Sequence, residues 1–514
     1  MLELVLKDGM VVDGKNKKRF IADIGIKNGR IALIGKNLSG KKELGAEGKI
    51  VSPGFIDMHS HSDVSIVVKK RFDSKLKQGI TTEVTGQCGL SVYPVKNAKT
   101  REYLEKWAIE GKINSNSLKN FLHLKGLPCN VAPFAGHGNL RATYLGFENR
   151  APSKTELAKM KDLLAAVLKE KVFGLSSGLI YPPGCYSKTG ELVELVKVAR
   201  DFNCLYTSHI RGEGVTLLKS ISELIETGQS AKARVHISHI KCAAPSVLGK
   251  SKQVIKMIDT AYAKGLSITA DQYPYTASST VLSVFLPLWA SEGGKVVERL
   301  KDPVTRRNIE KEMIDSNLFI DGSVFKGVFI AGGNNKSIIG KSLSELAKKM
   351  KKPEFDVMFD IITEDPLTTM VSHSMIESDL INFIKYERVC IGSDSLCCLT
   401  DKDRGARPHP RSFGTFPRVL NRYVKLKKAL TLEEAVYKMT GLPAHIVGLN
   451  DRGVLEEGKI ADLVVFDENK IKDTATFEEP VSYPRGIDYV IIGGRIAVCR
   501  NEVRGYFGSV LKKE

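Results

Sequence analysis

The strongest constraint on the fold is an alternation of short apolar runs with amphipathic helical patterns through the middle of the chain. Eight runs are rich in apolar or β-branched residues, and they cover 54–61, 81–87, 129–136, 172–179, 205–210, 234–240, 267–273 and 389–394. Helical patterns lie between several of them, at 154–169, 191–200, 215–227 and 254–264. Strands that alternate with helices are typical of a parallel sheet. Eight such strands predict an α/β fold built on a (β/α)₈ barrel.

Both ends of the chain predict strands and turns instead. Near the start, two strand-like runs flank Asn28-Gly29, a dipeptide that favours a hairpin turn. Near the other end, the runs at 489–492 and 495–498 are separated by two glycines. We therefore predict one small β-domain that both ends build together, from residues 1–51 and 446–514.

The barrel, residues 52–445, contains a long stretch between its last two predicted strands. The seventh and eighth runs are farther apart in sequence than one helical crossover requires. We predict that residues 285–350 form an inserted subdomain or lid. Ser374 and Glu377 have the spacing of a capping box, which predicts that a helix begins there before the last strand.

Residues able to bind a metal lie at the ends of several runs. They are His59, His61, Cys88, His209, His239 and Asp394. Alternate residues of a strand point to the same side, so His59 and His61 can reach one point in space. Any one of the six could instead be a packed side chain, a satisfied polar group or a turn residue. In a barrel, however, all six emerge at one rim, and imidazole and thiolate suit Zn²⁺, so the sequence predicts a metal site there.

The net charge raises the question of nucleic-acid binding. The chain has 77 Lys and Arg against 58 Asp and Glu, a formal net charge of +19. The lysines are spread along predicted helix faces, and the sequence lacks zinc-finger spacing and RNA-binding signatures. We therefore interpret the charge as solvated surface that helps to attract anionic small molecules, and we expect no nucleic-acid partner.

The sequence favours a cytoplasmic protein. It has no uninterrupted apolar stretch of the ~18 residues that indicate a membrane span, and its first residues lack the basic and apolar regions of a signal peptide. Nine cysteines without a repeating spacing do not predict a disulfide framework. We expect no membrane partner and mostly buried, unpaired cysteines.

The motifs and their order resemble the amidohydrolase superfamily, and within it the N-acyl-D-amino-acid deacylases, or D-aminoacylases. The matching segments extend over nearly the whole chain and are 54–63, 81–89, 136–141, 174–184, 208–213, 237–241, 271–280, 392–394, 407–418, 438–444 and 461–467. The resemblance implies a distorted (β/α)₈ TIM-like barrel that carries zinc, with a small β-sandwich domain formed by both termini. It implies hydrolysis of the amide of an N-acyl-D-amino acid, or of a dipeptide with a C-terminal D-residue. The products are a carboxylate and a free D-amino acid.

The resemblance also implies how the metal ligands divide. One tightly bound Zn²⁺ would be held by Cys88, His209 and His239. A second position, weakly held or vacant, would be lined by His59, His61 and Asp394. In hydantoinases a carbamylated lysine bridges the metals, but the fourth run, 172–179, contains no lysine. A cysteine takes that place in the deacylases, and Cys88 matches it.

The resemblance makes Asp394 the general acid/base, because a carboxylate beside a metal-bound water can take a proton and hand it to the leaving amine. The alternative is that Asp394 only orients a histidine. The substrate carboxylate would be bound by Lys241, Tyr273 and Arg411. We expect His137 and His373 to be structural or to support ligands. The alternative activity is hydrolysis of a cyclic amide, as in hydantoinases and dihydropyrimidinases.

Overall fold

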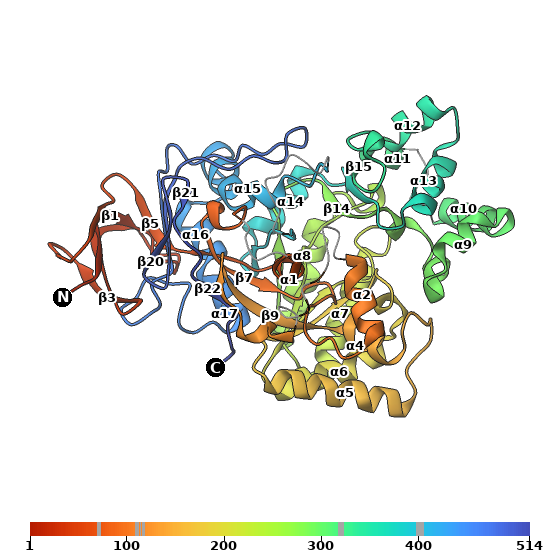
Figure 1. Cartoon of the computed structure of the whole chain (residues 1–514), viewed down its shortest axis with the longest axis horizontal. Helices are drawn as coiled ribbons and strands as arrows, with labels where there is room; N and C mark the ends of the chain where they lie inside the picture. Colours follow the sequence, from red (N-terminus) through yellow and green to blue (C-terminus); the bar gives the residue numbers. More distant parts are fainter. Residues whose placement is uncertain (69–72, 108–112, 114, 116–118, 317–322, 397–405) are drawn as a thin grey trace.

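The computed structural model of the chain describes residues 1–68, 73–107, 113, 115, 119–316, 323–396 and 406–514. At the centre of this described part lies an eight-stranded parallel sheet whose neighbouring strands follow the order of the chain (Figure 1). Its strands are β6 (Phe55–Asp57), β7 (Ile80–Thr85), β9 (Asn130–Gly136), β10 (Gly174–Gly178), β11 (Leu205–His209), β12 (Val235–Ile237), β13 (Ile268–Gln272) and β17 (Val389–Ile391). Each strand overlaps one of the eight apolar runs, and the predicted α/β barrel is confirmed.

The barrel is nearly closed because the segments after its first and last strands meet. The backbone amide of Asp394 donates to the carbonyl of His59 over 2.8 Å, and the amide of His61 donates to the carbonyl of Ser395 over 3.1 Å. A parallel bridge also joins Ser60 to Ser395. The segments that follow β6 and β17 therefore lie side by side, and they carry three of the predicted metal ligands.

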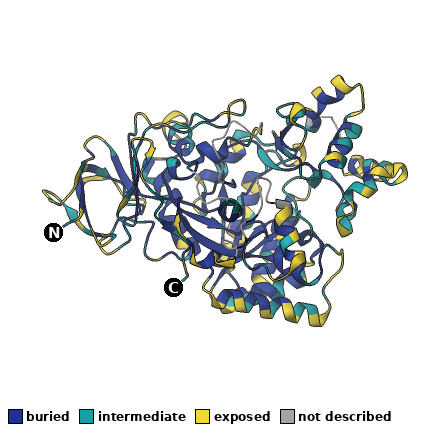
Figure 2. Cartoon of the chain, in the orientation of Figure 1, coloured by how far each residue is buried: buried dark blue, intermediate teal, exposed yellow. Residues whose placement is uncertain are grey.

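Helices pack against the barrel strands, which are largely buried (Figure 2). Those of the described chain are α1 (Ser62–Val68), α2 (Ala98–Trp107), α4 (His137–Tyr144), α5 (Lys154–Lys169), α6 (Thr189–Asp201), α7 (Leu217–Ala231), α8 (Ser251–Ala263), α14 (Glu377–Lys385), α15 (Arg411–Arg418), α16 (Leu432–Met439) and α17 (Gly441–Val447). The four predicted helices correspond to α5, α6, α7 and α8. Their apolar residues, such as Leu164, Leu195 and Ile221, share one core with strand residues such as Val235.

The start of α14 differs from the sequence prediction. At α5, Ser153 and Glu156 form a capping box with both reciprocal hydrogen bonds. The expected box of Ser374 and Glu377 does not form, because Ile376 is the N-cap residue and its side chain makes no capping hydrogen bond. Ile376 is extended, with φ −112° and ψ 147°, so the helix begins only at Glu377. The pattern predicted the helix correctly and its first residue wrongly.

Within the described residues, the two ends of the chain form one nine-stranded sheet, at the left of Figure 1. Its strands are β1 (Leu4–Val11), β2 (Phe20–Lys27), β3 (Arg30–Gly35), β4 (Glu43–Gly45), β5 (Ile50–Pro53), β18 (Leu463–Phe466), β19 (Ile487–Ile492), β20 (Arg495–Cys499) and β21 (Glu502–Val503). β5 pairs with β1 on one side and β18 on the other, which joins the two ends of the chain. Both predicted hairpins are present, as β2–β3 and β19–β20. This sheet supports the proposal that residues 1–51 and 446–514 form a β-sandwich domain.

A unit with a core of its own lies between β13 and β17. Its sheet consists of β14 (Ser278–Val281), β15 (Val328–Gly332) and β16 (Thr369–Ser372), and its described helices are α9 (Val296–Lys301), α10 (Pro303–Asp315), α11 (Ser323–Gly327), α12 (Leu343–Met350) and α13 (Glu354–Glu364). Leu282, Leu346 and Phe359 belong to its apolar core. The helices project at the right of Figure 1. The unit extends beyond the predicted insertion at 285–350, because β14 and β16 pair across it. No helix in the described ranges combines the length and apolar character that crossing a membrane requires.

Candidate metal centre

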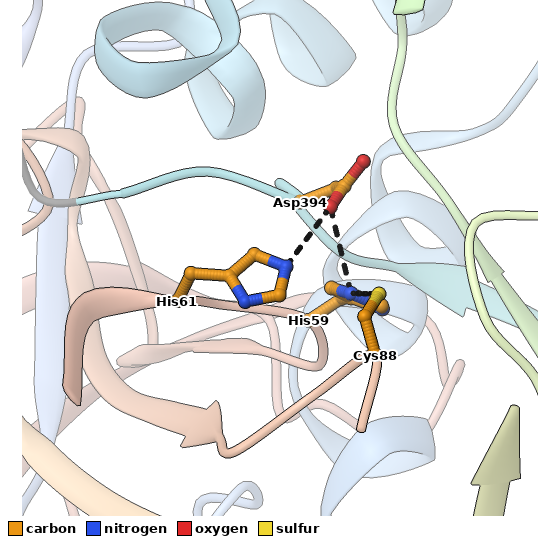
Figure 3. Close-up of side chains that lie close together, drawn as sticks. All are labelled: His59, His61, Cys88 and Asp394. Carbon is orange, nitrogen blue, oxygen red and sulfur yellow. Dashed lines mark hydrogen bonds and ion pairs between the residues drawn. The ribbon is translucent and has the colours of Figure 1, made fainter. Parts of the chain in front are cut away.

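Side chains at the carboxyl ends of the barrel strands form two overlapping clusters. One contains His59, His61, Cys88 and Asp394, and the other contains Cys88, His209 and His239. Within each cluster the possible ligand atoms lie within 4.8 Å of one another. Figure 3 shows the first cluster, in which both imidazoles are directed toward Asp394. The structure therefore brings together all six residues that the strand ends suggested, and Cys88 belongs to both clusters.

Cys88 lies where the two clusters join. Its Sγ atom is 3.3 Å from His59 Nε2, 3.4 Å from His239 Nε2 and 3.6 Å from His209 Nδ1. Burial raises the pKa of the thiol, but the charges of His59 and His239 and the hydrogen bonds with His209 and His239 together lower it to well below the usual value. A buried thiolate beside three imidazoles is a set of donors that fits Zn²⁺.

Three of the six residues have unusual backbone conformations. The φ angle is 53° at Cys88, 38° at His239 and 51° at Asp394, in the left-handed region that non-glycine residues rarely adopt. Backbone strain of this kind gathers at functional sites. Gly86, two residues before Cys88, has no room for a side chain, because a Cβ atom there would lie 2.2 Å from the carbonyl oxygen of Phe134. The glycine thus allows β7 to turn tightly against β9 and direct the thiol toward the histidines.

Asp394 faces the clusters and a cavity of about 410 Å³. Its Oδ1 atom is 3.4 Å from His61 Nε2 and 3.5 Å from His59 Nε2, and its Oδ2 atom is 2.7 Å from Arg411 Nη1. Burial raises the pKa of this carboxyl group, but the charges of Arg411, His239 and His59 and the hydrogen bond with His61 together lower it to well below the usual value. Asp394 is therefore ionised at neutral pH, and its carboxylate can act as a metal ligand or as a base.

The three predicted carboxylate-binding residues gather around one aromatic ring. Arg411 lies 4.9 Å and Lys241 lies 5.5 Å from the centre of the Tyr273 ring. The Tyr273 hydroxyl is buried and makes no hydrogen bond within the described chain. His409 holds the backbone of Arg411, because its Nδ1 atom accepts from the Arg411 amide over 3.0 Å. Lys241 forms an ion pair with Glu213. The structure thus places these three residues together, with Arg411 in the cavity wall.

Asp271 and Glu213 contact candidate ligands, and His236 contacts Asp271; the sequence prediction missed all three. Asp271 Oδ2 lies 3.3 Å from His59 Nδ1 and 2.9 Å from His236 Nε2. Glu213 Oε1 lies 2.8 Å from His239 Nδ1. Outer partners of this kind orient ligating imidazoles. Glu213 and Asp271 lie near strand ends and within the matching segments 208–213 and 271–280, but neither signal identifies them as partners of the metal ligands.

His137 and His373 lie outside both clusters. His137 is buried on α4, and its Nε2 atom is 2.8 Å from Glu191 Oε1 on α6. His373 packs its ring against Phe329 and Phe477. These contacts fit the structural or supporting roles expected of both histidines.

Comparisons with known proteins cover nearly the full length of the chain. A model of the amidohydrolase family matches residues 385–498. The D-aminoacylase of Alcaligenes xylosoxydans xylosoxydans is 32% identical, and the N-acyl-D-glutamate deacylase of the same organism is 33% identical, each over 96% of this chain and 93% of its own. A solved structure of N-acyl-D-glutamate deacylase from Bordetella bronchiseptica, complexed with zinc and a phosphonate mimic of the tetrahedral intermediate, is 31% identical over 99% of both chains, with a TM-score of 0.84. The chain therefore belongs to the D-aminoacylase family of the amidohydrolases.

Proposed function

We propose that the chain is a metal-dependent hydrolase that cleaves the amide bond of N-acyl-D-amino acids and releases a carboxylate and a free D-amino acid. The observation that carries this proposal is the position of Arg411, whose guanidinium lies 2.7 Å from Asp394 in the wall of the same cavity. A guanidinium there can hold the α-carboxylate of a substrate while the neighbouring amide reaches the two clusters of possible metal ligands. The activities for which the two Alcaligenes relatives are named support the same substrate class.

The enzyme uses a metal cofactor, and the donor atoms of the clusters fit Zn²⁺. We infer that one zinc is held tightly by Cys88, His209 and His239. A second position, weakly held or vacant, is lined by His59, His61 and Asp394. Bound zinc supplies a Lewis acid that polarises the amide carbonyl and lowers the pKa of water.

Asp394 is the group that moves the proton. Its carboxylate accepts a proton from the water that attacks the amide carbonyl and then donates this proton to the leaving nitrogen. One water is consumed, the C–N bond breaks, and an acid and an amine form. The ion pair with Arg411 keeps Asp394 ionised before the substrate arrives.

Two anchored groups select the D-configuration in this proposal. The cluster of Lys241, Tyr273 and Arg411 holds the α-carboxylate, and the metal clusters hold the amide. With both groups fixed, the side chain and the hydrogen on the α-carbon exchange places between the two enantiomers, and only one enantiomer fits. The inserted unit contributes Val281 and Leu367 to the cavity wall, which we infer helps to select the side chain. A dipeptide with a C-terminal D-residue presents the same amide and carboxylate.

We also propose a cytoplasmic location. In the described chain seven cysteines are free thiols, and six of these are buried. Free thiols fit a reducing compartment, in which disulfides are rare.

The test combines metal analysis of the purified protein with a screen of N-acetyl and N-formyl D- and L-amino acids for release of free amine. We expect zinc to copurify, and we expect D-substrates to be favoured by about 100-fold or more. A hydantoin and a dihydropyrimidine complete the screen. Ring opening of either, without amine release from any acyl-D-amino acid, would assign the enzyme to cyclic amides instead.

A further inference from the structure

Glu213 lies between the cluster of Cys88, His209 and His239 and the predicted carboxylate-binding residue Lys241. It lies four residues after His209, in the loop that follows β11. Its side chain is 15% exposed, and its Oε1 atom is 2.8 Å from His239 Nδ1, 3.8 Å from His209 Nε2 and in an ion pair with Lys241 Nζ. The backbone carbonyl of Glu213 accepts from the amide of Ala243 over 2.9 Å, which ties this loop to the one after β12.

The two histidines are arranged in the same way around this carboxylate. His209 turns Nδ1 toward Cys88 and Nε2 toward Glu213, whereas His239 turns Nε2 toward Cys88 and Nδ1 toward Glu213. An imidazole that binds a metal through one nitrogen carries its proton on the other nitrogen. A carboxylate facing that second nitrogen fixes the tautomer and the orientation of the ring. Glu213 is placed to do this for His239 directly and for His209 at longer range.

Lys241 connects the same carboxylate to the substrate. Its Nζ atom pairs with Glu213 Oε1, the same oxygen that faces His239 Nδ1, so the ammonium and the imidazole share one acceptor. The lysine side chain is flexible, so its ammonium group can occupy several positions unless another group holds it. The ion pair with Glu213 therefore determines where the ammonium stands relative to His239.

We propose that Glu213 is a positioning residue that couples the metal position to the site of the substrate carboxylate. Its single Oε1 atom accepts from the ring of His239 and from Lys241, so it sets the distance between a metal ligand and a carboxylate-binding cation. Glu213 belongs to neither cluster of possible metal ligands in the described chain. The role of Lys241 in this inference rests on the proposed function, whereas the role of His239 does not.

The test uses two variants of the full-length protein and one matched control. Glu213→Ala removes the carboxylate, and Glu213→Gln keeps an oxygen of the same reach but removes its charge. Glu223→Ala is the control, because Glu223 is 16% exposed, pairs with Arg211 and touches neither cluster. Two quantities are measured: zinc affinity, by competition with a chelator, and the KM of the preferred N-acetyl-D-amino acid at saturating zinc.

We expect Glu213→Ala to weaken zinc binding by ~10- to 100-fold, the range found when outer partners of metal ligands are removed. At saturating zinc its KM should rise about tenfold or more, because Lys241 loses its fixed position. Glu213→Gln should bind zinc within about threefold of the wild type, because its amide oxygen still accepts from His239, while its KM stays raised because a neutral oxygen holds the ammonium less firmly. The control should change neither quantity.

Zinc binding of Glu213→Ala that equals the wild type would overturn the inference, and so would weakened zinc binding with an unchanged KM. These outcomes differ from failure of the proposed function, in which the wild type itself releases no amine. In that case the zinc titrations still decide whether Glu213 orients the histidines. If Glu213→Ala does not fold, the raised KM and retained zinc of Glu213→Gln carry the test alone.

Discussion

Replacing Lys75 by methionine should destabilise the barrel where its first and last strands meet. Lys75 is fully buried just before the short 3₁₀ helix η1 (Leu76–Gln78). Its Nζ atom lies 2.6 Å from Asp57 Oδ2, 2.7 Å from Ser393 Oγ and 3.4 Å from Glu83 Oε1. These partners belong to β6, to the segment after β17 and to β7. One ammonium therefore joins three segments, and candidate metal ligands follow each of these strands: His59 and His61 after β6, Cys88 after β7 and Asp394 after β17.

The magnitude follows from what the substitution leaves behind. Methionine has a similar length, so little volume is lost and the packing cost stays below ~1.5 kcal/mol. The larger cost is electrostatic, because Asp57 and Glu83 remain buried without their cation. Removing one partner of a buried ion pair costs about 3–5 kcal/mol. We expect a loss of this size in the free energy of unfolding.

Urea-induced unfolding, followed by circular dichroism in the presence of zinc, measures this loss. Lys77→Met is the control, because Lys77 lies 4.0 Å from the centre of the Tyr483 ring and its loss should cost about 1 kcal/mol or less. The double variant Lys75→Met/Asp57→Asn should cost at least ~1 kcal/mol less than the sum of the single variants, because the two residues interact. A Lys75→Met protein within ~1 kcal/mol of the wild type would refute the reasoning.

Three further predictions concern the proton, the substrate carboxylate and a buried lysine. Asp394→Ala should lower kcat by ~10²- to 10⁴-fold while the protein keeps its tightly bound zinc. Steady-state kinetics and metal analysis measure both quantities, and near-normal turnover would rule out proton transfer by Asp394. Arg411→Lys should raise the KM of acyl-D-amino acids by ~10- to 100-fold, because a bidentate contact with the substrate carboxylate becomes a monodentate one. An unchanged KM would show that Arg411 does not bind the substrate carboxylate. Burial lowers the pKa of Lys438 from 10.5 to about 8, so between these values the unfolded chain binds a proton that the folded chain lacks. The contribution of Lys438 to the free energy of unfolding should then rise by up to ~3 kcal/mol as the pH increases through that window. Urea midpoints of the wild type and Lys438→Met, measured at pH 8 and pH 10, should therefore differ more at pH 10, in favour of the wild type. The same difference at both pH values would contradict this prediction.

The sequence predicted the barrel and the residues at its rim because both depend on local patterns. An apolar run of a few residues marks a buried strand, and a polar residue directly after it has only one edge of the sheet on which to emerge. His59, His61 and Asp394 could be identified in this way, although they follow the first and last strands of the barrel and meet only because the barrel nearly closes. Which cluster each ligand belongs to came from the family resemblance, not from the pattern.

The features that the sequence did not reveal depend on contacts between distant segments. Glu213 and Asp271 support imidazoles only because the barrel brings them there. Both lie in segments that match the family, but the match alone does not identify them as partners of the metal ligands. The inserted unit was predicted too short because β14 and β16 pair across a long intervening segment. The box expected at Ser374 failed because extended backbone at Ile376 delays the helix.

The central claim is that Cys88 holds the metal on which the activity depends. Zinc content per chain, measured for Cys88→Ala after the same purification as the wild type, tests it most directly. Cys204→Ala is the matched control, because Cys204 is also a buried free thiol but lies outside both clusters. We predict about one tightly bound zinc in the wild type and in Cys204→Ala, and less than ~0.1 in Cys88→Ala. Full zinc occupancy in Cys88→Ala would contradict the proposed metal centre.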